Sequence, residues 1–300
     1  MNRTIKNWLI VAASLILSGG IVFVITMMNL HWDFTKLSTV KYETNTHELR
    51  EDFSDISIRT STADIQFLPS EDGACEVICY EAEKRIHSVS VKDGVLTIEE
   101  MDTRKWYDYI EFFSFQTPKI TIRLPKNVYG TLTTKQSTGD FQLTHRIALG
   151  NVSISTSTGN VLVSDVSADE MKVSVSTGHI TIRTVTCEEG LSATVSTGKT
   201  ELADVTCHSF NSYGNTGNIS LKNVVASGIC CIERSTGDVS LDGCDAAELS
   251  ISTDTGHVKG KLLSEKVFIA RTDTGRVNVP VTTTGGKCKI TTDTGDIVFE

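Results

Sequence analysis

The sequence is poor in proline, poor in aromatic residues, and has no excess of positive charge. It contains 4 prolines and 22 glycines in 300 residues, which excludes a collagen-like or Pro-rich disordered chain. The formal net charge is −9, and Arg3 and Lys6 contribute +2 within the first thirty residues, so the remainder carries −11. An acidic surface repels a phosphate backbone, and nucleic-acid binding is therefore not expected.

Sequence signatures of catalysis and cofactor binding are also lacking. The chain has no phosphate-binding loop, no serine-elbow motif and no paired Ser/His/Asp signature. Cys75 and Cys79 are four residues apart, but no histidine or second cysteine pair completes a zinc spacing. We therefore expect no cofactor, no metal and no enzymatic activity.

One long apolar run stands near the N-terminus. From Trp8 to Met28 there are 21 residues without a charge, enough for a helix to cross a hydrocarbon core of about 30 Å. A signal peptide is the alternative, although the run exceeds the usual apolar region and no A-x-A cleavage site follows it. We expect residues 1–30 to form a transmembrane anchor. Arg3 and Lys6 outweigh Lys36 and Lys41 only narrowly, and they favour a cytoplasmic N-terminus with the C-terminal domain outside the cell membrane.

A repeat of 19 or 20 residues runs through the second half of the chain. A Thr-Gly pair marks each copy, and its glycines are Gly139, Gly159, Gly178, Gly198, Gly217, Gly237, Gly256, Gly275 and Gly295. Apolar residues follow two and four positions after most of these glycines, as in Val161/Val163 and Ile180/Ile182, with Thr200 and Gly260 as exceptions. This alternation is typical of strands with one buried face.

Because one copy cannot bury its apolar face alone, the copies are expected to stack. We predict a single-stranded parallel β-helix over residues 131–300, right-handed, with about one coil per repeat. An antiparallel sandwich is the alternative for short, evenly spaced strands. In the β-helix, Val161 and Ile180 lie in adjacent rungs of one buried column.

The repeated glycines have a structural explanation. Glycine fits where each coil turns with a positive φ, and the preceding threonines form a ladder of hydroxyls. The following position holds residues as different as Asp140, His179 and Lys199. Such variety argues against a catalytic or ligand-binding role for this position.

Residues 31–130 are predicted to form a linker and an irregular, β-rich cap. Residues 61–67 resemble a degenerate first repeat, and Asp93-Gly94 predicts a hairpin turn. A cap would hide the unpaired strand edge at this end of a solenoid. At the other end the sequence stops at Glu300, one strand after Gly295, so we expect an edge there that is open or covered by another chain.

Six of the aromatic residues lie between Trp106 and Phe115. They are expected either to plug the first coil or to form a contact surface for a glycan, a protein partner or a lipid headgroup. In the second case Trp106, Tyr107 and Tyr109 are the candidate interaction residues.

Two further features leave alternatives open. Cys187 and Cys207 occupy one column a rung apart, within Cα reach of a disulfide but in a geometry that usually keeps Cβ atoms too far apart. Asp254, Asp273 and Asp293 share one repeat position. They form either a calcium site or a solvated acidic stripe.

Several segments together resemble the bacterial putative-adhesin family. They are the N-terminal anchor, the stretch from Trp32 to Asn45, Arg104-Lys105-Trp106-Tyr107 and the iterated Ser-Thr-Gly-Asp-Val. The resemblance implies a membrane-anchored β-solenoid of a kind found chiefly in Gram-positive bacteria, in some cases beside cell-envelope stress systems, and it supplies no catalytic residues. The chain departs from the regular repeat at residues 212–215 and at Gly260.

The expected function is that of a non-catalytic, extracytoplasmic binding or structural module at the cell envelope, with an envelope glycan or a protein as its partner. An accessory of an envelope stress response, acting through a membrane partner, is the first alternative. A polysaccharide-active β-helix enzyme is the second, and it would need acids, bases and aromatic platforms on one face.

Overall fold

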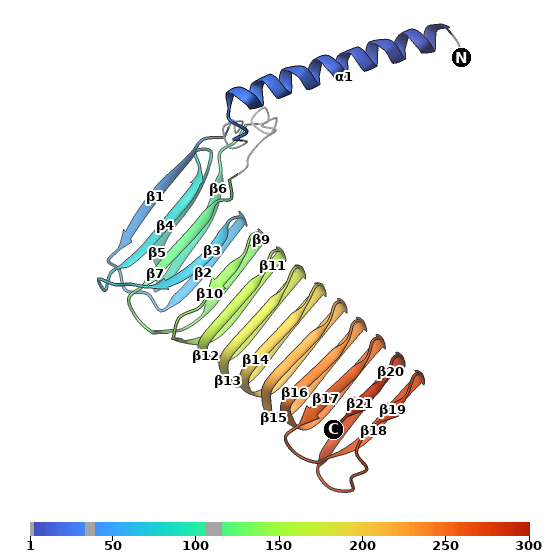
Figure 1. Ribbon diagram of the computed structural model, residues 1–300. Helices are drawn as coiled ribbons and strands as arrows, with labels where there is room; N and C mark the ends of the chain where they lie inside the picture. Colours follow the sequence, from blue (N-terminus) through green and yellow to red (C-terminus); the bar gives the residue numbers. More distant parts are fainter. Residues whose placement is uncertain (1–2, 34–39, 106–115) are drawn as a thin grey trace.

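The computed structural model describes residues 3–33, 40–105 and 116–300. One helix, α1 (Arg3–Asn29), precedes an all-β body in which the strands form one hydrogen-bonded sheet wound into a solenoid of about nine turns (Figure 1). The strands are β1 (Tyr42–Leu49), β2 (Asp55–Thr62), β3 (Asp64–Pro69), β4 (Cys75–Ala82), β5 (Arg85–Lys92), β6 (Val95–Asp102), β7 (Lys119–Leu124), β8 (Val128–Tyr129), β9 (Leu132–Thr138), β10 (Phe141–Leu143), β11 (Ile147–Thr158), β12 (Val161–Thr177), β13 (Ile180–Thr197), β14 (Thr200–Thr216), β15 (Ile219–Thr236), β16 (Val239–Thr255), β17 (Val258–Leu262), β18 (Lys266–Thr274), β19 (Val277–Asn278), β20 (Gly286–Thr294) and β21 (Ile297–Phe299).

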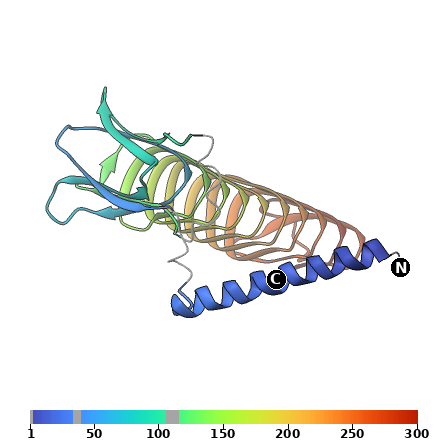
Figure 2. The ribbon, with the colours of Figure 1, turned by 90° about the horizontal axis from the view of Figure 1, so that it is seen from above.

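The middle rungs stack in the order of the sequence. Val161 pairs with Ile180, and Ile180 pairs with Thr200, in parallel register. Val161 and Ile180 are buried in one continuous core. The solenoid prediction is therefore confirmed and the sandwich alternative is wrong. Seen from above, the coils overlie one another along a single axis (Figure 2).

The Thr-Gly turns form the first corner of each coil. The nine repeat glycines have φ angles between 130° and 158°. Their backbones also lie very close together: a Cβ on Gly198 would sit 1.7 Å from the carbonyl oxygen of Gly178. Both the positive φ and this close approach exclude a side chain here.

A second corner, six residues after the glycine, was not predicted from the sequence. Asp165, Thr184, Asp204, Asn223 and Gly243 occupy it in five successive rungs, with φ between 51° and 63°. Asp, Asn and Gly tolerate this left-handed conformation, whereas the β-branched Thr184 does so at a cost.

The rungs at the C-terminal end do not follow sequence order. Strand β20 pairs with β16 on one side and β18 on the other, and β21 lies likewise between β17 and β19. The Gly295 copy is thus inserted between the Gly256 and Gly275 copies. The expectation that the open edge follows Gly295 is wrong, because the outermost rung is formed by β18 and β19.

The N-terminal end has a similar inversion. Strand β2 lies between β6 and β9, and β3 lies between β7 and β10, so the degenerate repeat at residues 61–67 is an inner rung. Antiparallel strands then cover the β6–β7 rung: β5 pairs with β6 through the Asp93-Gly94 turn, β4 pairs with β7, and β1 pairs with β4. The change of strand direction ends the parallel stack, as expected of a cap.

The irregular segment at residues 212–215 makes room for a buried arginine. Arg234 is 5 % exposed, and its Nη2 donates hydrogen bonds to Ser212 Oγ (2.8 Å) and Thr200 Oγ1 (3.2 Å). A Cβ on Gly214 would lie 2.7 Å from Arg234 Nη1. The small and polar residues of one rung, β14, therefore match one large cation in the next rung, β15.

Candidate functional site

A column of inward positions, three residues before the repeat glycine, is polar at both ends of the solenoid, whereas Val175 and Val195 occupy it in the middle rungs. In the C-terminal rungs its threonines donate to glycine carbonyls: Thr272 Oγ1 to Gly295 O (2.9 Å), Thr292 Oγ1 to Gly256 O (3.1 Å) and Thr253 Oγ1 to Gly237 O (3.3 Å). At the other end the column continues through Gln136 and Thr60, which are both buried. It therefore leads into the cap.

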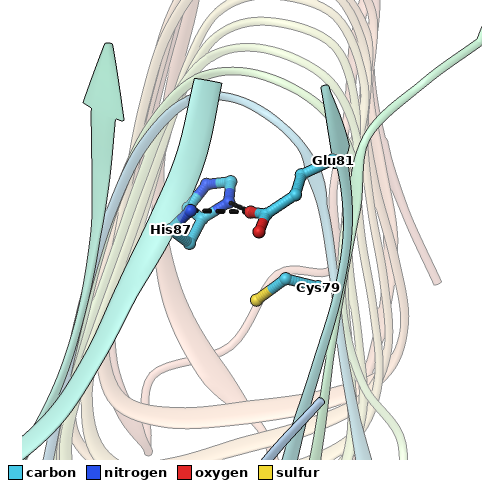
Figure 3. Close-up of side chains that lie close together, drawn as sticks. All are labelled: Cys79, Glu81 and His87. Carbon is cyan, nitrogen blue, oxygen red and sulfur yellow. Dashed lines mark hydrogen bonds and ion pairs between the residues drawn. The ribbon is translucent and has the colours of Figure 1, made fainter. Parts of the chain in front are cut away.

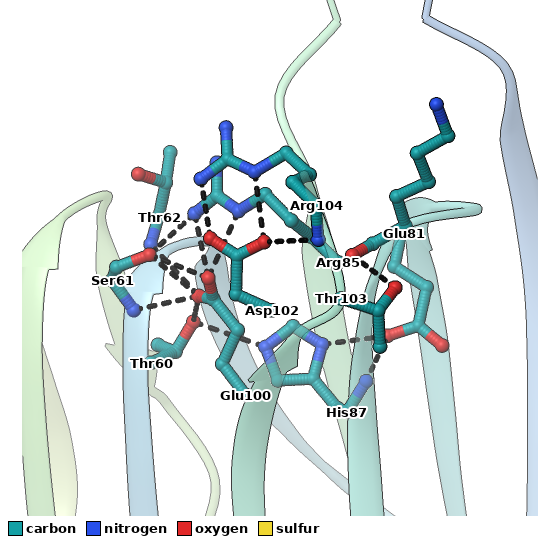
Figure 4. Close-up of polar contacts among 11 residues, drawn as sticks. Thr60, Ser61, Thr62, Glu81, Arg85, His87, Glu100, Asp102, Thr103 and Arg104 are labelled. Atoms are coloured by element: carbon teal, nitrogen blue, oxygen red, sulfur yellow. Dashed lines mark hydrogen bonds and ion pairs between the residues drawn. The ribbon is translucent and has the colours of Figure 1, made fainter. Parts of the chain in front are cut away.

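In the cap this column becomes a network of ionisable side chains (Figure 4). Glu81 Oε2 accepts hydrogen bonds from the backbone N–H and from Nδ1 of His87, both at 2.6 Å. His87 Nε2 lies 3.0 Å from Thr60 Oγ1, which donates to Glu100 Oε2, also at 3.0 Å. Glu81, His87 and Thr60 are buried. An unbroken chain of hydrogen bonds thus joins two carboxylates through an imidazole and a hydroxyl.

At the outer end of this network, both carboxylate oxygens of Glu100 accept hydrogen bonds from several donors. Arg85 Nη2 lies 2.7 Å from Glu100 Oε1, while the backbone N–H and hydroxyl of Ser61 donate to Oε2 at 2.8 and 2.7 Å. Burial favours the neutral carboxyl, but the hydrogen bonds from Ser61 and Arg85 outweigh it and lower the pKa of Glu100 to about 2. Glu100 is therefore a permanent anion at physiological pH.

Cys79 lies beside the Glu81–His87 pair, so the three side chains could be considered as metal ligands. Their ligand atoms lie within 4.8 Å of one another, and Figure 3 shows Cys79 and Glu81 on one strand facing His87. However, burial raises the pKa of the Cys79 thiol to about 12, and the Glu81 carboxylate is already held by His87 and by Asn45 Nδ2 at 2.8 Å. In this structure the Glu81 carboxylate is thus hydrogen-bonded to two side chains, and Cys79 lies beside it as a buried thiol.

A polar cleft opens on the outside of the network. It has a volume of about 540 Å³, and its wall includes Thr60, Ser61 and Glu100. The other lining residues are Arg59, Glu99, Lys135, Gln136, Ser137, Ser155 and Ser157. Charges of both signs and several hydroxyls suit a polar ligand with many hydrogen-bonding groups.

The variable position after each glycine has a common role that the sequence did not reveal. Except at Lys199 and Arg276, its side chain accepts a hydrogen bond from the backbone N–H of the equivalent residue one rung further along. The acceptors include Asp140 Oδ1 for Asn160 (2.8 Å) and His179 Nδ1 for Lys199 (3.0 Å). Asp, Asn and neutral His can all accept, which explains the apparent tolerance of this position.

The structure locates the other candidate residues as follows. Trp106, Tyr107 and Tyr109 lie outside the described residues. Cys187 and Cys207 face each other in register, but both are free thiols, and burial raises their pKa to about 12 and about 11. The three aspartates that share one repeat position are exposed. Along the solenoid axis they lie in the order Asp254, Asp293, Asp273.

Sequence reasoning missed the network at Glu81 and His87. Glu81 continues the inward alternation of Cys75, Val77 and Cys79 along β4. An acidic residue at an inward position is the signal that could have indicated a buried partner.

The fold and the site define a β-solenoid with an antiparallel cap, a buried polar network and an adjacent polar cleft. The Toastrack DUF4097 family matches residues 53–223 and 184–300, and the chain belongs to this family. No curated protein matches the sequence.

Solved structures with a similar fold include two described as a "putative adhesin". The one from Parabacteroides merdae is 12 % identical with a TM-score of 0.53, covering 87 % of this chain and 98 % of its own. The one from Bacteroides fragilis is 14 % identical with a TM-score of 0.47, covering 87 % and 97 %. A "putative lipid binding protein" from Parabacteroides distasonis is 20 % identical with a TM-score of 0.44, covering 73 % and 96 %.

Proposed function

We propose that this protein is a single-pass membrane protein whose solenoid lies outside the cytoplasm and serves as a non-catalytic binding module of the cell envelope. The proposal rests on a contrast between two parts of the chain. The solenoid buries its own apolar residues in one continuous core. Helix α1 exposes almost all of its apolar residues, with Trp8 71 % and Ile16 76 % exposed.

The exposed helix supports membrane insertion. An apolar surface of this size is unfavourable in water and favourable in hydrocarbon. The helix spans 27 residues, with a mean hydropathy of 2.5 over its most apolar stretch, which is long enough to cross a bilayer. The basic residues Arg3 and Lys6 favour a cytoplasmic N-terminus.

The state of the carboxylates supports a non-catalytic role. A general acid needs a raised pKa and access to substrate. The pKa of Glu100 is instead lowered, and Glu81 is 1 % exposed and bound to His87. Neither group suits the acid chemistry of a polysaccharide-active enzyme.

The polar cleft and the hydroxyl-bearing sheet beside it support a binding role. Ser155 lines the cleft, and Ser174 and Thr194 follow it in register on the next two rungs. This regular array of hydroxyls suits a glycan of the cell envelope, whose own hydroxyls repeat along the chain.

Membrane topology is tested with a membrane-impermeant maleimide. Seven of the eight cysteines are buried and Cys231 is half-buried. Cys231→Ser should therefore give a protein with little background labelling by the maleimide. In this background Ser174→Cys, on an exposed position of β12, should be labelled in intact cells, whereas Thr4→Cys should be labelled only after permeabilisation. The reverse pattern, or release of the chain from membranes by an alkaline wash, would contradict the proposal.

Binding is tested with the full chain in lipid nanodiscs and purified cell-wall glycan. Lys135 lines the cleft, whereas Lys222 is an exposed lysine on β15 and serves as the control. If Lys135→Glu abolishes retention on the glycan and Lys222→Glu does not, the cleft is supported as the binding surface. Equal retention of both variants places binding elsewhere. No retention of the wild-type chain contradicts a glycan ligand.

A further inference from the structure

The outermost rung at the C-terminal end has an open strand edge. Strand β18 pairs with β20 on one side, and within the described parts of the chain no strand pairs with its other side. Its nine residues include no proline. Lys266, which could protect the edge, is instead buried and paired with Asp245 at 2.6 Å. Natural proteins rarely leave such an edge without protection.

The apolar core is also exposed at this end. Phe268 and Ala270 point inward from β18 but are only partly buried, whereas Cys288 and Ile290, their partners one rung further in, are fully buried. Val277 on β19 is 44 % exposed and Ile269 is 51 % exposed. The opposite end of the solenoid is covered by antiparallel strands. The C-terminal rung is therefore the end suited to a partner that supplies both a strand and apolar cover.

We propose that this partner is a second copy of the chain, bound through the same rung. In an antiparallel pair of β18 strands related by a two-fold axis at Thr272, Arg271 lies opposite the partner's Asp273. The symmetry repeats this contact, so two opposite-charge pairs form. Arg271 and Asp273 are exposed on the same face and lie 3.0 Å apart within one chain.

The charge pattern also selects the register. An axis at Arg271 would place two arginines opposite each other, and an axis at Asp273 would oppose two aspartates. Directly opposed like charges are destabilising. Only the axis between them, at Thr272, matches each charge with its opposite.

Pairing through β18 determines where the N-terminal helices of the two chains lie. Helix α1 is followed by β1, which belongs to the cap, at the end of the solenoid far from β18 (Figure 1). Two chains that pair through their C-terminal rungs carry their helices at opposite ends of the pair. Such a dimer would join two membrane surfaces that face each other.

The full-length chain in detergent micelles tests this pairing by size-exclusion chromatography with light scattering. The wild-type chain should dimerise as its concentration rises. Arg271→Asp places carboxylates opposite each other, and Asp273→Arg places guanidinium groups opposite each other. Each single variant should weaken the dimer about tenfold or more, and the double variant should restore it.

Lys172→Glu provides the matched control. Lys172 and Glu170 form an exposed pair of the same spacing on a middle rung, 2.8 Å apart, so this variant should dimerise like the wild type. The three substituted residues, Lys172, Arg271 and Asp273, are exposed, and unchanged thermal melting should confirm that every variant is folded. A wild-type chain that stays monomeric at all concentrations would overturn the proposal. So would a dimer that the single charge reversals leave intact.

Discussion

Gly260 and Phe299 lie directly opposite each other in adjacent rungs, and the ring of Phe299 fills the space that a side chain at position 260 would need. A Cβ on Gly260 would lie 2.5 Å from Phe299 Cε1. In the regular rungs the same repeat position holds Val163, Ile182 or Leu202. Phe299 also packs on Phe268, with 5.3 Å between ring centroids. The absence of a side chain at Gly260 therefore leaves the space that the ring of Phe299 occupies.

The first prediction tests this complementarity. Gly260→Leu restores the regular repeat residue but overlaps the Phe299 ring, and it should destabilise the protein by about 2 kcal/mol. Phe299→Val should cost a similar amount by leaving a cavity. Because each change makes room for the other, the double variant should be more stable than the sum of the single effects predicts, by about 1 kcal/mol or more. Urea unfolding of the four proteins measures this coupling, and simple additivity would show that the two residues do not share one space.

The same pair helps to explain why the last two copies exchange places. Every copy offers nearly the same buried columns, so the hydrophobic pattern fixes the register of each rung but not the order of the rungs. The order in which the rungs stack depends on individual residues that differ between the copies. Phe299 fits against Gly260, and Asp296 accepts from the backbone N–H of Arg276 at 2.9 Å. An arginine offers no acceptor to a further rung, and Arg276 lies in the outermost one.

The second prediction concerns the glycine turns. Gly198 has a φ of 141°, and an added Cβ would meet the carbonyl oxygen of Gly178 at 1.7 Å. Gly198→Ala should therefore destabilise the protein by about 3 kcal/mol or more. At Gly190 the nearest atom to an added Cβ is the side-chain oxygen of Ser209 at 3.0 Å, so Gly190→Ala serves as the control and should cost much less. Equal losses in denaturant unfolding would contradict this explanation.

The third prediction concerns the second corner. Thr184 has a φ of 51° at a position where neighbouring rungs place Asp165 and Asp204. Asparagine adopts this conformation more readily than a β-branched residue, so Thr184→Asn should stabilise the protein by about 1 kcal/mol. Thr181→Asn, in the body of the same strand, should instead be neutral or destabilising. A loss of thermal stability in Thr184→Asn would contradict the strain at this corner.

The sequence predicts the parts of the fold that repeat. It does not predict the parts whose arrangement depends on a single residue. The pairing of Val161 with Ile180 follows from glycine spacing and strand alternation alone. The inversion of rungs at both ends does not, because equivalent copies are interchangeable in such a pattern. The network around His87 was missed for a related reason: Glu81 and Glu100 come from different strands, and neither has a recognisable motif.

The fourth prediction is a pH dependence that arises at Glu100. The pKa of this carboxyl is lowered from 4.5 to about 2 in the folded protein. A lowered pKa means that the charged form stabilises the fold, and this contribution is fully present above the unfolded pKa. It should be lost as the pH falls from about 4.5 to about 2. The stability difference between the wild type and Glu100→Gln, measured by thermal melting, should therefore shrink over this range. A constant difference would show that ionised Glu100 does not support the cap.

The last prediction concerns the ladder of acceptors after the repeat glycines. From Asp140 to His179 each side chain accepts a hydrogen bond from the next backbone N–H, and the ladder resumes at Asn218, whose Oδ1 accepts from Asp238 at 2.9 Å. Lys199, between these two runs, is a donor only and has no acceptor to offer Asn218. Lys199→Asn should join the two runs and stabilise the protein by about 1 kcal/mol. Lys199→Gln, with a longer side chain that changes the charge in the same way, controls for the lost lysine. If both variants raise the midpoint of urea unfolding equally, the effect comes from charge and not from the ladder; a gain confined to asparagine identifies the hydrogen bond as its source.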